Sequence, residues 1–344
     1  MRHLAKASRF DRCSARGPDA IAGARWTAGA ASPKAPGVTH ARPAIAAEPQ
    51  TLRTRGWDDY ALVDSGDGWK LERYGPYRVV RPEPQCWWKP RLPESEWAKA
   101  DAVFDPAAEE EDDGRWRFES RPPESFPLGW GAVKLHARFT AFRHLAFFPE
   151  QAANWAWLEA AVKAAPSPQP PRVLNLFGYT GVASLVCAAA GAHVTHVDAS
   201  KKAIGWAREN AALSGMEALP VRWICEDARK YLQREVKRGS LYQGVILDPP
   251  KYGRGPTGEV WRLFEDLPDI VDLCAQVLAP DARFLLLNAY AARISGLSLA
   301  HLMAEALRGR GGVVDWGELA LSEEKGLGDS REIGLSFFAR WAGR

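Results

Sequence analysis

The stretch RVLNLFGYTGVASLVCAAAGA, residues 172–192, decides the fold class of this chain. It opens with a short apolar run, passes through a turn that carries Gly178 and Gly181, and continues with the composition of a helix. A strand that enters a helix through a glycine-containing turn is the repeating unit of a parallel α/β sheet. The stretch therefore predicts that such a sheet begins here.

The same unit recurs down the chain. The short apolar runs are RVLNLF, HVTHVD, VRWIC, GVILD and RFLLLN, and they alternate with helical stretches, of which EVWRLFEDLPDIVDLCAQVL (259–278) is the longest. This alternation predicts a doubly wound, mostly parallel, Rossmann-like α/β sheet. Two late runs, GVVDWGELAL and REIGLSFFARW, have no long helix between them, so we expect an antiparallel C-terminal hairpin and seven strands in all.

The segments before this sheet differ in composition. Residues 1–56 are rich in Ala, Arg, Gly and Pro without an apolar period, which predicts a disordered basic leader. An organellar transit peptide, or a start codon placed too early, would give the same composition. Residues 57–145 carry short alternating runs between Gly, Asp and Pro breaks, which predicts a small β-rich domain. We expect residues 146–170 to form a connecting helix and linker, and residues 171–344 to form the sheet domain.

Composition and charge narrow the class of protein. The chain of 344 residues is 46% hydrophobic and 25% charged, as is typical of a soluble globular protein. The leader has a net charge of +7, whereas the whole chain has a net charge of +3. The rest of the chain therefore has a net charge of −4, which does not by itself indicate a nucleic-acid-binding surface. No run is long enough for a membrane span or a secretory signal, so we expect a cytoplasmic protein. The five scattered cysteines favour neither disulfides nor a metal site.

Polar and small residues follow the first four predicted strands of the sheet domain. They are Asn175, Asp198, Ala199, Ser200, Glu226, Asp227, Asp248, Pro249 and Pro250. In an open α/β sheet the ligand binds at the carboxyl ends of the strands, and carboxylates are rarely buried without a partner. Acids at three successive strand ends therefore predict a ligand site.

The glycine turn discriminates between two kinds of ligand. A nicotinamide dinucleotide requires G-x-G-x-x-G for its pyrophosphate, whereas this turn offers G-x-x-G with bulky Phe177 and Tyr179 between and beside the glycines. The turn favours S-adenosylmethionine, which has no phosphate. We assign Asp198 to its ribose hydroxyls and Asp227 to its adenine amine. A nicotinamide-dependent oxidoreductase stays open as the alternative from another class.

From about residue 58 onward the chain resembles the class I S-adenosylmethionine-dependent methyltransferases, in the branch related to bacterial large-subunit rRNA methyltransferases. The stretches that carry the resemblance are FFPEQAANW (147–155), NLFGYTG (175–181), HVDASKKAIGWARENAALSG (196–215), ILDPPKYGRG (246–255) and LLLNAY (285–290). The resemblance implies that a set of residues binds or supports the cofactor, namely Phe148, Gln151, Tyr179, Thr180, Gly181 and Asn210. It also implies RNA as the partner.

The branch members that methylate cytosine at C5 use a cysteine after the Pro-Pro of the fourth strand or after the fifth strand, where this chain has Lys251 and Asn288-Ala289-Tyr290. Another atom is therefore expected to be methylated.

The segment Asp248-Pro249-Pro250-Lys251-Tyr252 resembles the acid-Pro-Pro-aromatic loop of amino-group methyltransferases. Proline lacks an N–H donor, so this loop presents acceptors to a ligand. We expect an amine held by Asp248 and the Pro249 carbonyl, with Tyr252 stacked on a flipped base and Lys251 and Arg254 on a phosphate. The sequence thus predicts methylation of a base nitrogen in RNA; a protein or small-molecule acceptor, or a silent RNA-binding protein, stays open.

Overall fold

The computed structural model describes residues 41–107, 114–119, 122–164, 169–290, 293–324 and 330–343. These residues belong to one compact unit, His40–Arg344. The expected leader, residues 1–56, lies outside the described residues as far as residue 40. Among the described residues no helix is both long and apolar enough to cross a membrane.

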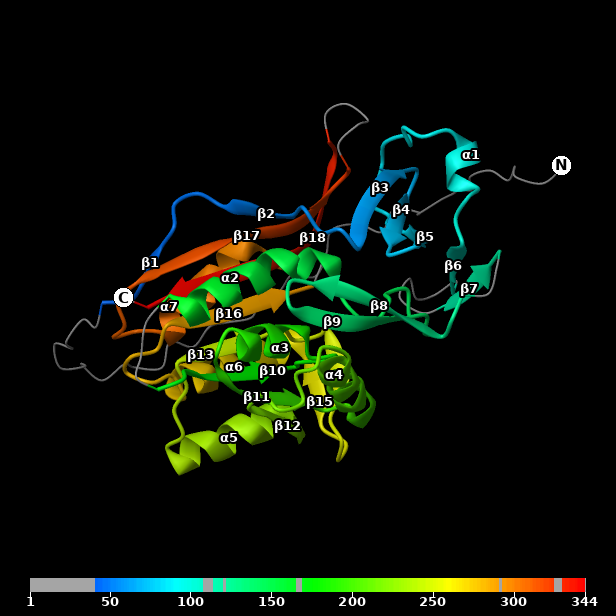
Figure 1. The fold of residues 1–344 in the computed structure, drawn as a ribbon. Coiled ribbons are helices and arrows are strands. Elements are labelled where there is room, and N and C mark those ends of the chain that lie inside the picture. Colours follow the sequence, from blue (N-terminus) through cyan, green and yellow to red (C-terminus); the bar gives the residue numbers. More distant parts are fainter. Residues whose placement is uncertain are drawn as a thin grey trace, which may run out of the picture. The chain divides into compact units, whose positions relative to one another are not determined.

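The central sheet contains the seven expected strands. They are β10 (Arg172–Leu176), β11 (His193–Asp198), β12 (Val221–Cys225), β13 (Gly244–Leu247), β16 (Phe284–Ala289), β17 (Val313–Ser322) and β18 (Glu332–Ala342). Their order is β17-β18-β16-β13-β10-β11-β12, and β18 runs antiparallel to both of its neighbours while the rest are parallel (Figure 1). The predicted mostly parallel sheet with a C-terminal hairpin is confirmed.

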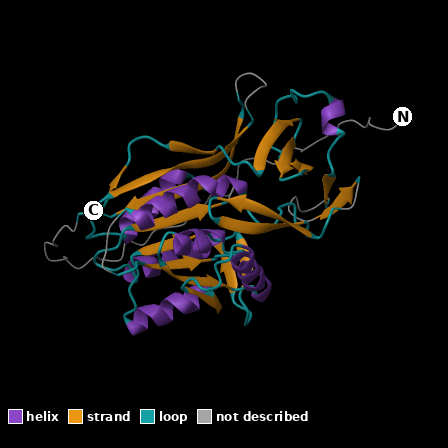
Figure 2. Ribbon diagram, viewed as in Figure 1, coloured by secondary structure: helices purple, strands orange, loops and turns teal. Residues whose placement is uncertain are grey.

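Helices cover both faces of this sheet (Figure 2). They are α2 (Ala152–Lys163), α3 (Val182–Ala189), α4 (Lys201–Leu213), α5 (Ala228–Arg238), α6 (Leu263–Gln276) and α7 (Gly296–Ala306). Because successive strand residues point to opposite faces, Val173 and Ile246 pack with Leu158 of α2, whereas Leu174 and Val245 pack with α5, α6 and α7. The inner strands β10, β13 and β16 are thus buried on both sides.

The strand order reverses at β10, which lies between β11 and β13. The helices that follow β10 and β13 therefore lie on opposite faces, and a crevice is left where the carboxyl ends of these strands meet. This crevice positions the site described below.

Two short strands correct the expected leader boundary. Residues Ala44–Ile45 (β1) and Gln50–Thr54 (β2) pair parallel with β17 and extend the sheet to nine strands. The indole of Trp316 donates to the Ala46 carbonyl at 2.8 Å, and the Thr54 hydroxyl donates to the Pro149 carbonyl at 2.8 Å. Main-chain pairing with the edge of β17 holds these two strands in place. Such pairing does not require apolar side chains, so the sequence of the two strands shows no apolar period.

The helical stretch expected from residue 259 begins later than predicted. Helix α6 starts at Leu263, and Val260–Arg262 forms strand β15, which pairs with β14 (Tyr252–Arg254) in a small antiparallel hairpin. The turn between them contains Gly258 at φ +96°, a backbone conformation that suits glycine and cannot continue into a helix. The hairpin brings Trp261 back toward the loop that follows β13.

The predicted β-rich domain is present. One sheet contains β3 (Tyr60–Gly66), β4 (Trp69–Tyr74), β5 (Tyr77–Pro82), β6 (Ala102–Pro106) and β7 (Gly114–Phe118), with the short helix α1 (Glu94–Trp97) before β6. A separate hairpin pairs β8 (Ser125–Trp130) with β9 (Val133–Arg138). Trp155 of α2 packs edge-on against Trp57 and Trp130, so aromatic packing joins this domain to the helix that precedes β10.

Candidate active site

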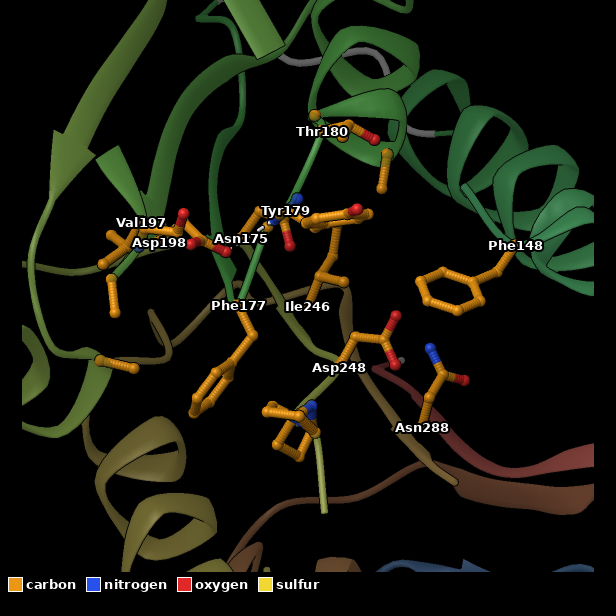
Figure 3. A pocket seen from close by; sticks show the side chains of 18 of the residues that line it. Phe148, Asn175, Phe177, Tyr179, Thr180, Val197, Asp198, Ile246, Asp248 and Asn288 are labelled. Carbon is orange, nitrogen blue, oxygen red and sulfur yellow. Dashed lines mark hydrogen bonds between the residues drawn. The ribbon is translucent and has the colours of Figure 1, made fainter. Parts of the chain in front are cut away.

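A pocket of about 370 Å³ opens at the carboxyl ends of β10, β11, β12 and β13 (Figure 3). The structure brings together in its lining most of the residues predicted from the sequence. They are Phe148, Gln151, Asn175, Phe177, Gly178, Tyr179, Thr180, Gly181, Asp198, Ala199, Ser200, Asp227, Asp248, Pro249 and Pro250. The acids of three strand ends therefore face one cavity.

Three of the predicted residues lie outside the lining, namely Asn210, Tyr252 and Lys251, of which Lys251 is exposed. Asn210 is buried in α4, where its amide donates to the Thr180 carbonyl at 2.9 Å and accepts from the His136 N–H at 2.9 Å. Asn210 thus supports the turn from behind, the position expected for it. The Tyr252 side chain is 51% exposed on β14, and the pocket wall beside it comes instead from Gly253 and Trp261.

The turn from Phe177 to Gly181 is an unusual piece of backbone. Phe177, Tyr179 and Gly181 have φ values of +55°, +48° and +82°. Non-glycine residues rarely adopt this left-handed conformation, and where they do the surrounding structure holds them, often at functional sites. A side chain at Gly178 would collide with the buried ring of His196. The glycine is therefore needed for packing against β11, while Phe177 and Tyr179 face the cavity.

Asp198 at the end of β11 is anchored by main-chain donors. Its Oδ2 accepts from the N–H of Tyr179 and its Oδ1 from the N–H of Ser200, both at 2.8 Å. Burial raises the pKa of Asp198, and the two N–H donors offset part of that rise. Ser200, not Asp198, caps helix α4 by accepting from the N–H of Ala203 at 3.2 Å. Each carboxylate oxygen of Asp198 keeps a second acceptor position for a ligand hydroxyl.

The two acids after β12 have different partners. Glu226 forms an ion pair with Arg234 of α5. Asp227 caps that helix, its Oδ1 accepting from the N–H of Lys230 at 2.9 Å. One carboxylate oxygen of Asp227 is thus used for the cap, and the other is available to the pocket that Asp227 lines.

Of the acids that line the pocket, Asp248 at the end of β13 has the weakest hydrogen bonding. Its Oδ2 accepts from the Gln151 amide at 3.3 Å, and its Oδ1 is buried without a hydrogen-bond partner among the described residues. Burial and the nearby charge of Glu150 raise the pKa of Asp248 to about 7, and the Asn288 amide offsets part of the rise. A buried carboxylate oxygen without a partner is costly, so this atom marks a place for a donor from a ligand.

Aromatic side chains wall the cavity around Asp248. The Phe148 ring lies 5.5 Å from the Tyr290 ring and 6.1 Å from the Tyr179 ring, centroid to centroid. Across the pocket, Trp261 packs 4.9 Å from Phe177 and its indole donates to the Pro250 carbonyl at 2.7 Å. The indole holds the Pro-Pro loop in place.

Several residues of this wall were missed by sequence reasoning. Asn288 lies near the end of the fifth strand and Tyr290 follows that strand, so the strand-end rule that found Asp248 could have found them too. Trp261 gave no such signal, because its surroundings have the pattern of a helix. Asn154 lies inside a helix that was expected to serve as a connection.

The charges of the lining decide which ligand fits. Four acids line the pocket, Asp198, Glu226, Asp227 and Asp248, against one described cation, Arg254. A pyrophosphate needs cations or N–H donors, whereas S-adenosylmethionine carries a sulfonium, an ammonium and several hydroxyl and amine donors. The residues present fit S-adenosylmethionine.

Comparisons with known proteins agree with this geometry. The chain is similar to the crystal structure of an S-adenosylmethionine-dependent methyltransferase from Agrobacterium tumefaciens, with 51% identity, a TM-score of 0.84, and coverage of 89% of this chain and 97% of that one. A candidate methyltransferase solved in complex with S-adenosylhomocysteine shares the fold at 15% identity and a TM-score of 0.60, with coverage of 83% and 75%.

Curated relatives match a shorter part of the chain. Ribosomal RNA large subunit methyltransferase I of Aeromonas hydrophila is 33% identical over 151 residues, which are 44% of this chain and 36% of that protein. The chain thus spans little more than a third of the length of that relative. No family model matches the chain.

Proposed function

This chain belongs to the S-adenosylmethionine-dependent methyltransferases, and from that premise we propose that it methylates a base nitrogen in ribosomal RNA in the cytosol. The cofactor is S-adenosylmethionine, which supplies an electrophilic methyl group when bound. The oxidoreductase alternative is thereby set aside. The residues of this chain bind the cofactor, and they hold and orient the acceptor amine.

The cofactor residues divide by the chemistry of their atoms. Asp198 would accept from the ribose hydroxyls, since its carboxylate is already oriented by the N–H groups of Tyr179 and Ser200. Asp227 would accept from the adenine amine with the oxygen that does not cap α5. The side-chain amide of Asn175 donates to the Ser184 hydroxyl at 2.9 Å and so fixes the first turn of α3.

The single observation that carries the acceptor assignment is the unpartnered Oδ1 of Asp248, buried in a wall that also contains two prolines. An exocyclic base amine offers two N–H donors and a lone pair. Held by Asp248 Oδ1 and the Pro249 carbonyl, the amine would have its lone pair directed at the incoming methyl group. Such orientation lowers the barrier of a displacement by several kcal/mol, on the order of a hundredfold or more in rate.

Two observations support RNA as the acceptor. The aromatic rings of Phe148, Tyr179 and Tyr290 provide flat surfaces beside Asp248 on which a flipped base can stack. The curated relative described above is named for its action on large-subunit ribosomal RNA. Exposed Tyr252 would lie outside the pocket, against a neighbouring nucleotide.

Two substitutions separate cofactor binding from transfer. We expect Asp198→Ala to weaken S-adenosylhomocysteine binding roughly 10- to 100-fold, because it removes one or two charge-assisted hydrogen bonds. We expect Asp248→Ala to keep that affinity within a few-fold while transfer falls by at least about 100-fold. Calorimetry measures the first quantity, and methyl transfer to ribosomal RNA, mapped by mass spectrometry in RNA with and without the enzyme, measures the second.

The control is Asp272→Ala, which removes an exposed carboxylate of α6 and should change neither quantity. Full transfer by Asp248→Ala would overturn the assignment of the amine to Asp248. A wild-type enzyme that binds S-adenosylhomocysteine but adds no methyl mark to ribosomal RNA would overturn the proposed substrate.

A further inference from the structure

Arg340 of β18 is a buried arginine behind the pocket, with a side chain surrounded by rings and amides. Its guanidinium lies 4.9 Å from the Trp157 ring centroid and 4.8 Å from that of Phe338. Among the described residues no carboxylate forms an ion pair with it, and burial lowers its pKa to about 9, with Asp315 offsetting part of the shift. A buried charge contributes little to stability by itself, so Arg340 calls for another explanation.

The polar contacts of Arg340 all go to acceptors near the site. Its Nε donates to Asn154 Oδ1 at 3.0 Å, its Nη2 donates to the same oxygen, and Nη2 also donates to the Ala153 carbonyl at 3.1 Å. A guanidinium has donors and no acceptor. Asn154 must therefore turn its oxygen toward Arg340 and its amide nitrogen away.

The orientation of Asn154 fixes the next amides. Asn154 Nδ2 donates to Gln151 Oε1 at 2.7 Å and to Asn288 Oδ1 at 2.8 Å, and Asn288 Nδ2 donates to Gln151 Oε1 at 3.2 Å. With its oxygen occupied by two donors, Gln151 must present Nε2 to the pocket. That nitrogen donates to Tyr290 Oη at 2.7 Å and to Asp248 Oδ2 at 3.3 Å.

We propose that Arg340 is a positioning residue for methyl transfer: through Asn154 and Gln151 it holds an N–H donor against one oxygen of Asp248 and leaves the other oxygen for the acceptor amine. The part that concerns the amine rests on the proposed function, whereas the orientation of the amides does not. The shape of an amide group fits its site in either of two orientations, and the donor-only arginine decides between them.

Loss of Arg340 would release both amides to rotate. A rotated Gln151 would place its carbonyl oxygen against Asp248 Oδ2, and two facing acceptors favour the protonated carboxyl. The titratable groups that face Asp248 are Glu150, from the single turn Pro149–Gln151, and Tyr290 after β16, while Lys70 and Arg81 act on Glu150. The raised pKa of Asp248 comes from burial and the charge of Glu150, with no contribution from the charge of Arg340, so a shift in the ionisation of Asp248 on replacing Arg340 would report the amides.

The first test needs no methyl acceptor. Thermal unfolding of the full chain with and without Asp248→Asn, followed from pH 5 to pH 9, gives the pH at which Asp248 ionises. We expect Arg340→Met to move this midpoint upward by about one pH unit. The matched control is Arg310→Met, because Arg310 also donates to main-chain carbonyls, those of Leu278 and Ala279, and lies over a tryptophan ring, yet contacts nothing in the chain of amides. It should leave the midpoint unchanged.

Asn154→Asp provides a variant that keeps Arg340 satisfied. The new carboxylate accepts from the guanidinium but cannot donate to Gln151, so the chain of amides is broken without an unpaired charge. We expect the melting temperature to stay close to that of the wild type, kcat on ribosomal RNA to fall roughly tenfold or more, and KM for S-adenosylmethionine to change less than about threefold. Arg340→Lys, a donor-only cation, should restore part of the kcat lost in Arg340→Met.

A wild-type midpoint in Arg340→Met together with a wild-type kcat in Asn154→Asp would overturn the inference and reduce Arg340 to a packing residue. A midpoint shifted in Arg340→Met but not in Arg310→Met would support it even if no ribosomal RNA were methylated, in which case the proposed substrate would fail and the orientation of Asp248 by Arg340 would stand.

Discussion

Glu72 in the β-rich domain and Asp248 in the pocket are two buried carboxylates with opposite surroundings. Glu72 accepts two hydrogen bonds of 2.7 Å from the Arg81 guanidinium and one of 2.8 Å from the Tyr60 hydroxyl. Burial by itself raises the pKa of Glu72, but the charges of Arg81 and Lys70 outweigh it and lower the pKa to about 2. Asp248 faces no cation but only amides, of which that of Gln151 donates at 3.3 Å, and its pKa rises to about 7.

The difference teaches which buried charge serves the fold and which serves a ligand. A carboxylate such as Glu72, whose two oxygens both accept hydrogen bonds from the protein, needs no donor from another molecule. A carboxylate with a free oxygen facing a cavity is stabilised only when a ligand provides the donor. The degree of pairing, more than burial, distinguishes the two roles.

The largest effect is expected from breaking the Glu72 pair. Arg81→Met leaves the Glu72 carboxylate buried without a cation, and we expect the free energy of unfolding to fall by about 3–5 kcal/mol at pH 7. Chemical denaturation at constant temperature measures this. Arg117→Met is the control, since Arg117 and Asp105 form an exposed ion pair whose loss should cost less than about 1 kcal/mol. Equal losses in the two variants would contradict the distinction between the buried Glu72 pair and an exposed ion pair.

Removing the charge of Asp248 should have the opposite sign. The folded pKa of Asp248, about 7, lies above its ordinary value of 3.8, so its contribution to stability is present below about pH 4 and lost as the pH rises through 7. Asp248→Asn carries no charge and should be more stable than the wild type at pH 8 by up to about 4 kcal/mol, with no difference at pH 4. Denaturation curves at the two pH values check this; a variant less stable than the wild type at pH 8 would refute it.

The smallest expected effect concerns the neighbour of Asp248. Burial raises the pKa of Glu150, and the charge of Glu150 in turn raises the pKa of Asp248. Transfer should therefore increase through about pH 7 in the wild type, as Asp248 becomes an acceptor. Glu150→Gln should lower that midpoint by up to about one pH unit, which corresponds to about 1.4 kcal/mol. The pH dependence of kcat measures it, and Glu159→Gln, an exposed acid of α2, should leave the profile unchanged.

The acids at the strand ends could be predicted from the sequence because the carboxyl ends of parallel strands meet at one edge. Asp198, Asp227 and Asp248 are far apart in the chain and still line one pocket. The C-terminal hairpin was equally visible, since two long alternating runs without a helix between them leave few arrangements. These features depend on local pattern and on the rules of sheet topology.

The features that were missed depend on contacts between distant segments. Arg340 and Asn154 are 186 residues apart and meet because β18 lies beside β16, under helix α2. Trp261 enters the pocket because residues 260–262 pair with residues 252–254, and the same pairing leaves the Tyr252 side chain exposed. No local pattern of residue types distinguishes such side chains from ordinary core or surface residues.

The pairing of β2 with β17 also sets an order of events during synthesis. Gln50 of β2 lies opposite Gly317 of β17, so the strand made early has its partner only after roughly 270 further residues have left the ribosome. At a translation rate of about 5–20 residues per second this takes tens of seconds. The strands from β10 to β16 can meet first, and the sheet acquires its outer edge last. During that interval β2 has no strand to pair with, and a chaperone would be expected to bind there.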